Sequence, residues 1–201
     1  MNFRLVSFLF YFTLVFTSCQ KDSDSNDDQF IDPNGSVDNG RDNDQDNEEI
    51  GTPCKNGYAG KYPCKGYDLL AQINLSSFKS NGGNDCWGWT DPDTQKEYVL
   101  MGLDDGTAFI DISEPTDPIL LGKLPTTTET SSWRDIKVHE NHAYIVSEAA
   151  EHGIQVFDLT RLREAEPKQN FTPERVLKTV PTAHNIAINP DSGYGLSLIH
   201  I

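Results

Sequence analysis

The sequence predicts an all-β protein, a partial β-propeller of about two and a half repeats that follows a signal peptide and a disordered acidic tether. Three observations predict this fold. Short runs of β-branched and aromatic residues follow one another from Cys54 onward. Gly, Pro, Asp and Asn separate these runs, and no long helical periodicity interrupts them. The runs also recur at a nearly constant spacing, which is typical of repeat architectures.

Residues 1–18 have the features of a signal peptide. Arg4 supplies a positive charge, and residues 5–16 form an apolar run that is too short to span a bilayer comfortably. Residues 16–19 resemble a lipobox, so we expect Cys19 to carry the lipid that anchors the protein in a membrane. The alternative is a secretory signal in which this cysteine is incidental.

Residues 19–51 are expected to form a disordered acidic tether. Residues 20–50 hold 11 Asp and Glu against 2 Lys and Arg and contain almost no large apolar side chains. Asp22 and Asp24 also resemble an export signal that follows the lipidated cysteine. We therefore expect a lipid-anchored protein of the outer membrane, displayed on the cell surface, and a plain solvated spacer is the alternative. The whole chain has 31 Asp and Glu against 16 Lys and Arg, which disfavours a nucleic-acid partner.

Three further cysteines lie in a protein that is expected to work in an oxidising compartment. Cys54 and Cys64 bracket a turn rich in Gly and Pro, so the sequence predicts a disulfide between them. A metal site is the alternative, and the segment lacks nearby His or carboxylate ligands for it. Cys86 is left with no assigned partner.

One β domain is expected over residues 52–195. Its strands are predicted at 98–103, 107–112, 119–123, 135–139, 143–147, 154–159, 176–180 and 186–189. A single turn of helix is expected near residues 160–166. Gly106 and Gly153 lie in the connecting turns, where we expect each to adopt a positive φ.

The repeat is visible when these strands are aligned. Asp111 and Asp158 end matching strands and lie 47 positions apart, and residues 133–138 align with residues 183–188. Three tyrosines that open or precede apolar runs are spaced by 46 and 50 positions: Tyr98, Tyr144 and Tyr194. This period is that of a four-stranded propeller blade. A β-sandwich with chance similarity is the alternative.

Residues 109–113 and 156–160 resemble the LVIVD repeat. Longer stretches look like the choice-of-anchor B family of exported LVIVD proteins: residues 52–54, 62–64, 87–92, 132–137, 145–148 and 183–186. The resemblance covers residues 52–195, and Cys86 stands where an apolar residue is expected. It implies a propeller-like domain joined to a cell-surface anchor, with no assigned substrate or catalytic residue.

The resemblance also implies that further blades follow the third repeat. Residues 196–201 break the blade pattern and correspond to what a sequencing adapter encodes in one reading frame. We therefore expect these residues to be a non-native tail.

Four polar residues form the candidate ligand-binding site. Arg134 and Asp135 occupy the same repeat position as His184 and Asn185, at the start of the strand expected to be innermost. Strands of several blades converge at one mouth of a propeller channel, where ligands commonly bind. The alternative is structural, with Asp135 and Asn185 hydrogen-bonding to neighbouring blades and Arg134 paired to an acid.

Other residues give weaker signals. His139 and His142 flank one turn and His152 lies in another, so we expect all three to be exposed, and their spacing does not favour a metal site. No nucleophile elbow, phosphate loop or dinucleotide motif is present.

The sequence thus predicts no cofactor and no metal. It predicts a displayed binding or interaction domain with an unknown extracellular or periplasmic ligand and a membrane as partner through Cys19. The alternative is an exported enzyme with a polar or metal site at the channel mouth, completed by further blades.

Overall fold

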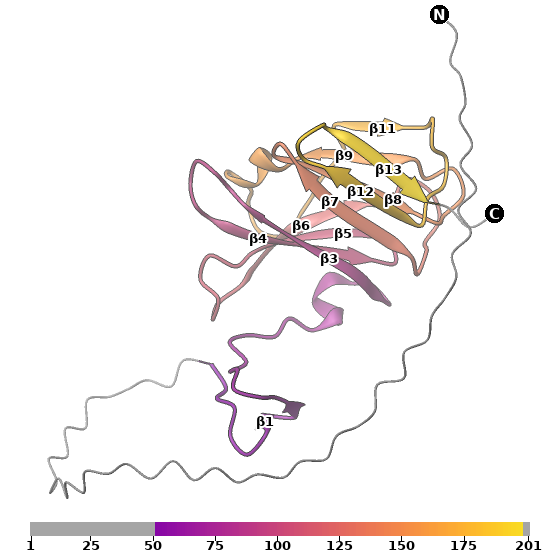
Figure 1. The fold of residues 1–201 in the computed structure, drawn as a ribbon. Coiled ribbons are helices and arrows are strands. Elements are labelled where there is room, and N and C mark those ends of the chain that lie inside the picture. Colours follow the sequence, from indigo (N-terminus) through magenta and orange to yellow (C-terminus); the bar gives the residue numbers. More distant parts are fainter. Residues whose placement is uncertain (1–50, 199–201) are drawn as a thin grey trace, which may run out of the picture. The chain divides into compact units, whose positions relative to one another are not determined.

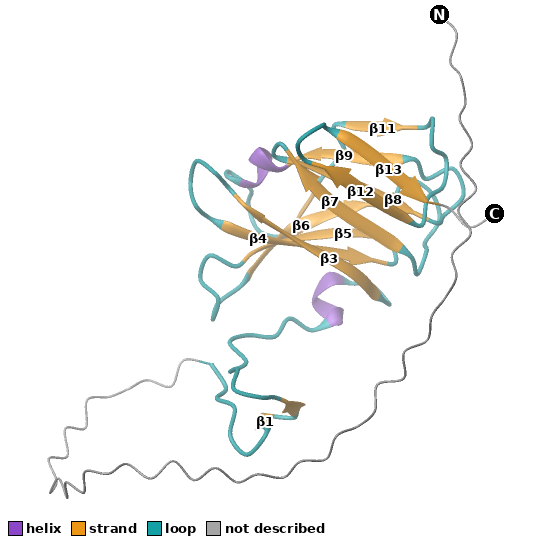
Figure 2. Ribbon diagram, viewed as in Figure 1, coloured by secondary structure: helices purple, strands orange, loops and turns teal. Residues whose placement is uncertain are grey.

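The protein is described here by a computed structural model over residues 51–198, and its architecture is all-β, as predicted (Figures 1 and 2). The strands are β1 (Tyr58–Ala59), β2 (Tyr62–Pro63), β3 (Gly83–Thr90), β4 (Glu97–Leu103), β5 (Gly106–Asp111), β6 (Ile119–Pro125), β7 (Arg134–His139), β8 (His142–Ser147), β9 (Ile154–Asp158), β10 (Gln169–Asn170), β11 (Arg175–Leu177), β12 (Asn185–Asn189) and β13 (Tyr194–Leu198). Two 3-10 helices are also present, η1 (Leu75–Phe78) and η2 (Leu159–Leu162). The predicted signal peptide, Cys19, nearly all of the tether and residues 199–201 lie outside the described residues.

Two four-stranded antiparallel meanders form the centre of the domain. The first sheet runs β3-β4-β5-β6, and the short strand β10 adds to its edge in parallel with β6. The second sheet runs β7-β8-β9-β11. A further hairpin, β12-β13, packs against β7 and β8, as Figure 1 shows. Neither 3-10 helix within residues 51–198 has the length and apolarity needed to cross a membrane.

The main core lies between the first and second sheets. Phe109 on β5 stacks on Phe157 on β9 with 4.5 Å between ring centroids. Phe171 meets both rings edge-on, at 5.3 and 5.2 Å. Leu100 and Ile145 are fully buried in the same cluster. Because both sheets contribute apolar side chains from alternate strand positions, their burial holds the two meanders face to face.

An ion pair joins the two sheets just past the end of β3. Arg163, at the end of η2, binds both carboxylate oxygens of Asp91 at 2.7 Å. The Asp91 side chain is fully buried. The Arg163 guanidinium therefore holds the pKa of Asp91 well below its usual range, although burial opposes ionisation.

The disulfide prediction is confirmed, because Cys54 and Cys64 are bonded with 5.9 Å between their Cα atoms. Gly57, inside the closed loop, has a φ of 80°. Cys86 has a free and exposed thiol on β3. A local loop between two cysteines was thus the correct interpretation of this segment.

Some elements differ from the sequence prediction. The strand β3 was not predicted, and β11 ends at Leu177 rather than at residue 180. Residues 196–198 were expected to break the strand pattern, but they pair with β12 as the second half of β13, with exposed side chains.

The two turn glycines behave differently. Gly153 has the expected positive φ of 79°, whereas Gly106 is not among the residues with positive φ. A Cβ on Gly106 would collide with the carbonyl oxygen of Leu124, so close approach of the backbones explains this glycine.

We expect Phe157→Ala to lower the free energy of unfolding by roughly 3–5 kcal/mol, because it removes a ring that packs against two other rings in the core. Urea denaturation followed by tryptophan fluorescence measures this loss. Val156→Ala, on the other face of the same strand, is the matched control and should cost far less. Equal losses would show that the two sheets do not depend on this aromatic cluster.

Candidate functional site

Three strands begin side by side at one edge of the domain. β7 packs against both β3 and β12. Their first residues surround an open hollow of about 200 Å³, lined by Asn84, Asp85, Trp133, Arg134, Asp135, His184 and Asn185. All four residues predicted from the sequence therefore line one hollow. Whether they bind a ligand stays a prediction.

Asn84 and Asp85 were not predicted from the sequence as part of the site. Asn84 precedes Arg134, and Asp85 precedes Asp135, in each case by 50 positions. The same interval separates Arg134 and Asp135 from His184 and Asn185. This interval was available in the sequence. It was overlooked because the strand that carries it, β3, was not predicted.

The two aspartates make equivalent bonds between neighbouring strands. Asp85 Oδ2 accepts a hydrogen bond of 2.9 Å from the backbone N–H of Ile136 on β7. Asp135 Oδ2 accepts one of 2.7 Å from the N–H of Ile186 on β12. Each carboxylate thus accepts a hydrogen bond from the first strand of the following sheet, 51 positions later. For Asp135 this is the structural role expected as the alternative to ligand binding.

The two aspartates differ in charge. Burial and the neighbouring Asp135 raise the pKa of Asp85 above its usual value. Burial also opposes ionisation of Asp135, but Lys137 Nζ, 2.5 Å from Oδ1, and the N–H of Ile186 lower its pKa. Lys137 in turn lies over the ring of Trp87, 4.4 Å from its centroid. Asp135 is therefore an anion held by its partners, and Asp85 is the carboxyl group more easily protonated.

The side chain of Arg134 is not at the surface of the hollow but between the two sheets, and it is only 2% exposed. Its Nε donates to the carbonyl oxygen of Leu103 at 2.9 Å, and Nη1 lies 3.0 Å from Nε2 of His152. None of the described acids is in contact with it, so the expected Arg134–acid pair is not found within residues 51–198. Its backbone N–H still borders the hollow, where it donates to Asn84 Oδ1 at 3.1 Å.

The side chain of His184 is partly exposed at the hollow. Its Nδ1 lies 2.5 Å from Glu148 Oε1, and the ring is 5.2 Å from that of Trp133. Trp133 is 52% exposed. The hollow thus presents an exposed indole beside a partly exposed imidazole that a carboxylate orients.

The expectation that His152 is exposed is wrong, since its exposure is 0%. Nδ1 donates to the carbonyl oxygen of Gly153 at 2.8 Å, so Nε2 accepts from Arg134. Burial, with the nearby Arg134 charge, lowers the pKa of His152 to about 4. His139 and His142 are partly exposed. Within residues 51–198, no group of three or more His, Cys, Asp or Glu side chains is placed to hold a metal ion.

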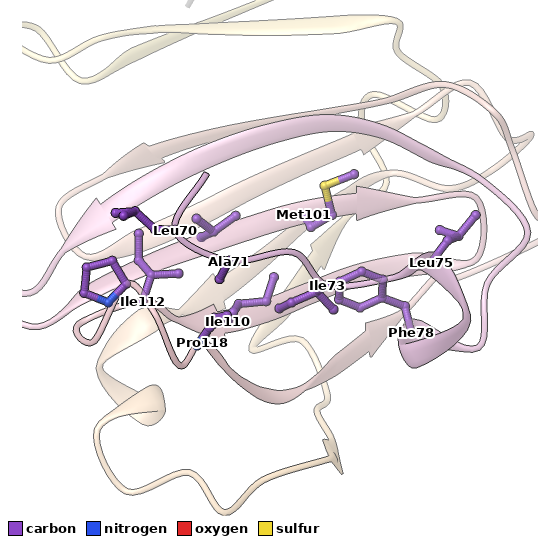
Figure 3. Close-up of a pocket in the computed structure, with 11 residues that line it drawn as sticks. Leu70, Ala71, Ile73, Leu75, Phe78, Met101, Ile110, Ile112 and Pro118 are labelled. Atoms are coloured by element: carbon purple, nitrogen blue, oxygen red, sulfur yellow. The ribbon is translucent and has the colours of Figure 1, made fainter. Parts of the chain in front are cut away.

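A larger, apolar groove of about 520 Å³ lies on the other face of the first sheet (Figure 3). The chain segment 70–78 covers part of this face. Its side chains Ile73 and Phe78 approach Met101, Ile110 and Ile112 of the sheet, as Figure 3 shows. The residues that line the groove are all apolar, in contrast to those of the hollow at the strand starts.

Comparisons of the chain with protein-family models, with curated proteins and with solved structures found no match. The resemblance to the choice-of-anchor B family therefore stays a prediction.

Acidification is expected to weaken the fold through His152. Its pKa falls from 6.5 to about 4 on folding, so unfolding takes up a proton between these two values. The stability contributed by the neutral ring is fully present above pH 6.5 and is lost as the pH falls to about 4, on the order of 3 kcal/mol in all. Urea denaturation across this range measures the loss.

His152→Gln is the matched variant, because its side chain keeps an acceptor for Arg134 and does not titrate. Stability of this variant should depend less on pH across the same range. An identical pH dependence in both proteins would contradict the role of the neutral imidazole.

Proposed function

We propose that this chain is a lipid-anchored protein of the outer membrane surface that displays a propeller-like binding domain, with its ligand site at the hollow of the three strand starts. The observation that carries the proposal is the convergence of three polar pairs, 50 positions apart, beside the exposed ring of Trp133. Polar groups that meet at one edge of stacked sheets are typical of ligand sites. The acidic segment before the domain suits a tether.

The facing of the strands supports the blade interpretation. Residues 46 positions apart point the same way: Leu100 and Val146 both face the following sheet, and Val99 and Ile145 both face the other side. Ile110 and Phe157, 47 positions apart, also face alike. The apolar groove of the first sheet is therefore equivalent to the surface by which the second sheet packs on the first. Stacking of equivalent units through equivalent faces is how blades assemble.

The chemistry of the hollow favours a polar ligand with hydroxyl groups, such as a carbohydrate. Trp133 offers a flat apolar surface, which sugar rings stack on. His184, Glu148 and Asn185 surround it with donors and acceptors. Asp85 and Asp135 hold the strands in place rather than bind the ligand.

An exported enzyme is the second candidate, and one observation favours it. The contact between Glu148 Oε1 and His184 Nδ1 is the arrangement that orients an imidazole as a general base. Release of reducing ends from a bound glycan would support this candidate, and stable binding without turnover would support the display protein.

Substitutions at the hollow are expected to separate binding from stability. We expect His184→Ala or Trp133→Ala to abolish glycan binding at little cost in stability, because both side chains are partly solvated. Asp135→Ala should instead cost about 1–3 kcal/mol, because the N–H of Ile186 loses its acceptor. Glycan-array binding and thermal melts of the same samples measure the two effects. A large stability loss in His184→Ala with unchanged binding would overturn the site.

The anchor is expected to depend on Cys19. Cys19→Ser should remove incorporation of labelled fatty acid and move the protein from the membrane to the soluble fraction. Cys86→Ser, which removes the exposed thiol of β3, is the control and should leave both unchanged. Wild-type protein that takes up no fatty acid would contradict the lipid anchor.

A further inference from the structure

Within residues 51–198, five buried side-chain atoms have no hydrogen-bond partner, and three of them belong to side chains near the point where Arg134 crosses between the sheets: Arg134 Nη2, Thr107 Oγ1 and Gln155 Oε1. Two of their side chains reach from the second sheet to the first. Arg134 Nε binds the carbonyl oxygen of Leu103, and Gln155 Nε2 binds that of Pro125 at 2.9 Å. Buried polar atoms without a partner are costly, so a group that satisfies them is expected in this layer.

Thr107 belongs to the same layer. It lies two residues before Phe109 on β5 and therefore on the strand face that packs against the second sheet. Thr107 pairs with Gly102, directly beside Leu103, which anchors Arg134. The hydroxyl group and the guanidinium thus belong to the same interface, one on each sheet, and both side chains are almost completely buried.

In the part of the chain that the structure describes, no acidic side chain is in contact with the charge of Arg134. Its two side-chain partners are a backbone carbonyl group and His152, which is neutral. The nearest acids act only at a distance, and Asp105 is already bound to Lys123 at 2.7 Å. Burial lowers the pKa of Arg134 to about 10, which still leaves the guanidinium charged near neutral pH. An isolated charge in such a place is strongly unfavourable unless an opposite charge accompanies it.

We propose that a small monovalent inorganic anion of the halide class binds between the two sheets, held by Arg134 Nη2 and the hydroxyl group of Thr107. An anion satisfies both donors and supplies the missing negative charge in one step. A water molecule that donates to the anion and to Gln155 Oε1 satisfies the third atom. This site is separate from the hollow and does not depend on the proposed ligand there.

Halide-dependent unfolding tests the site. The stability of the full chain is measured in sodium chloride and sodium bromide against sodium gluconate at equal ionic strength, because gluconate is too large for the interface. Above the dissociation constant, each tenfold rise in free halide should raise the folding equilibrium constant about tenfold for one site. Gluconate should have no such effect.

Variants make the result specific. Thr107→Val keeps the shape of the side chain and removes the donor, so it should lose most of the halide response, and Arg134→Met should lose all of it. Lys96→Met, which removes a half-exposed surface cation, is the control and should keep the wild-type response. Thr107→Val keeps the test decisive if Arg134→Met does not fold.

Crystals grown with bromide give an independent readout. An anomalous peak between Arg134 and Thr107 is expected. Equal stability in halide and gluconate, together with no peak, would show that only water fills the interface and would overturn the proposal. If Thr107→Val and Arg134→Met both keep the halide response, the response is a general salt effect, and this outcome would also overturn the proposed anion site.

Discussion

The hydrogen bond that Asp85 and Asp135 each accept from the backbone of the following sheet fixes the geometry on which the site depends. Asp85 binds the N–H of Ile136, and Asp135 binds the N–H of Ile186. The bonds set the spacing of β3, β7 and β12 at their starting residues. Because β3 is also tied to the second sheet past its other end, by Asp91 and its ion pair, the strand is held at both ends. Neither end relies on apolar packing alone.

Apolar burial supplies most of the cohesion between the sheets, but the interface is not uniformly apolar. The rings around Phe109 and Phe157 fill one part of it, and the buried polar layer of Arg134, His152 and Gln155 fills another. Aromatic packing tolerates small shifts, whereas a guanidinium with fixed partners accepts few positions. The polar layer therefore selects one relative placement of two sheets that apolar packing alone would leave less defined. The hollow borders this layer through the backbone of Arg134.

The sequence predicts those parts of the fold whose composition agrees with their environment. β4, β5, β8 and β9 are rich in β-branched and aromatic residues, and their predicted ends are within about two residues of the observed ones. β3 escaped prediction because Asn84, Asp85 and Gly88 have low strand propensity, and only the tertiary bonds of Asp85 explain their place in a strand. The exposure of His152 was mispredicted for a similar reason. The position of His152 in a turn predicts solvent exposure, and the neighbouring residues do not indicate that Arg134, 18 positions earlier, contacts its ring.

The two positions of each polar pair at the hollow differ in how much their side chains vary. The second position holds Asp85, Asp135 and Asn185, side chains that all offer an oxygen acceptor at the same reach, and in the two aspartates this oxygen binds the next strand. The first position holds Asn84, Arg134 and His184, and these side chains bind different partners. Arg134 is long enough to cross to Leu103, whereas His184 stays at the edge with Glu148. The second position bonds to the next strand in the same way in both aspartates, whereas the partners of the first position differ from pair to pair. In the proposed ligand site, differences in recognition are therefore expected to arise at the first position.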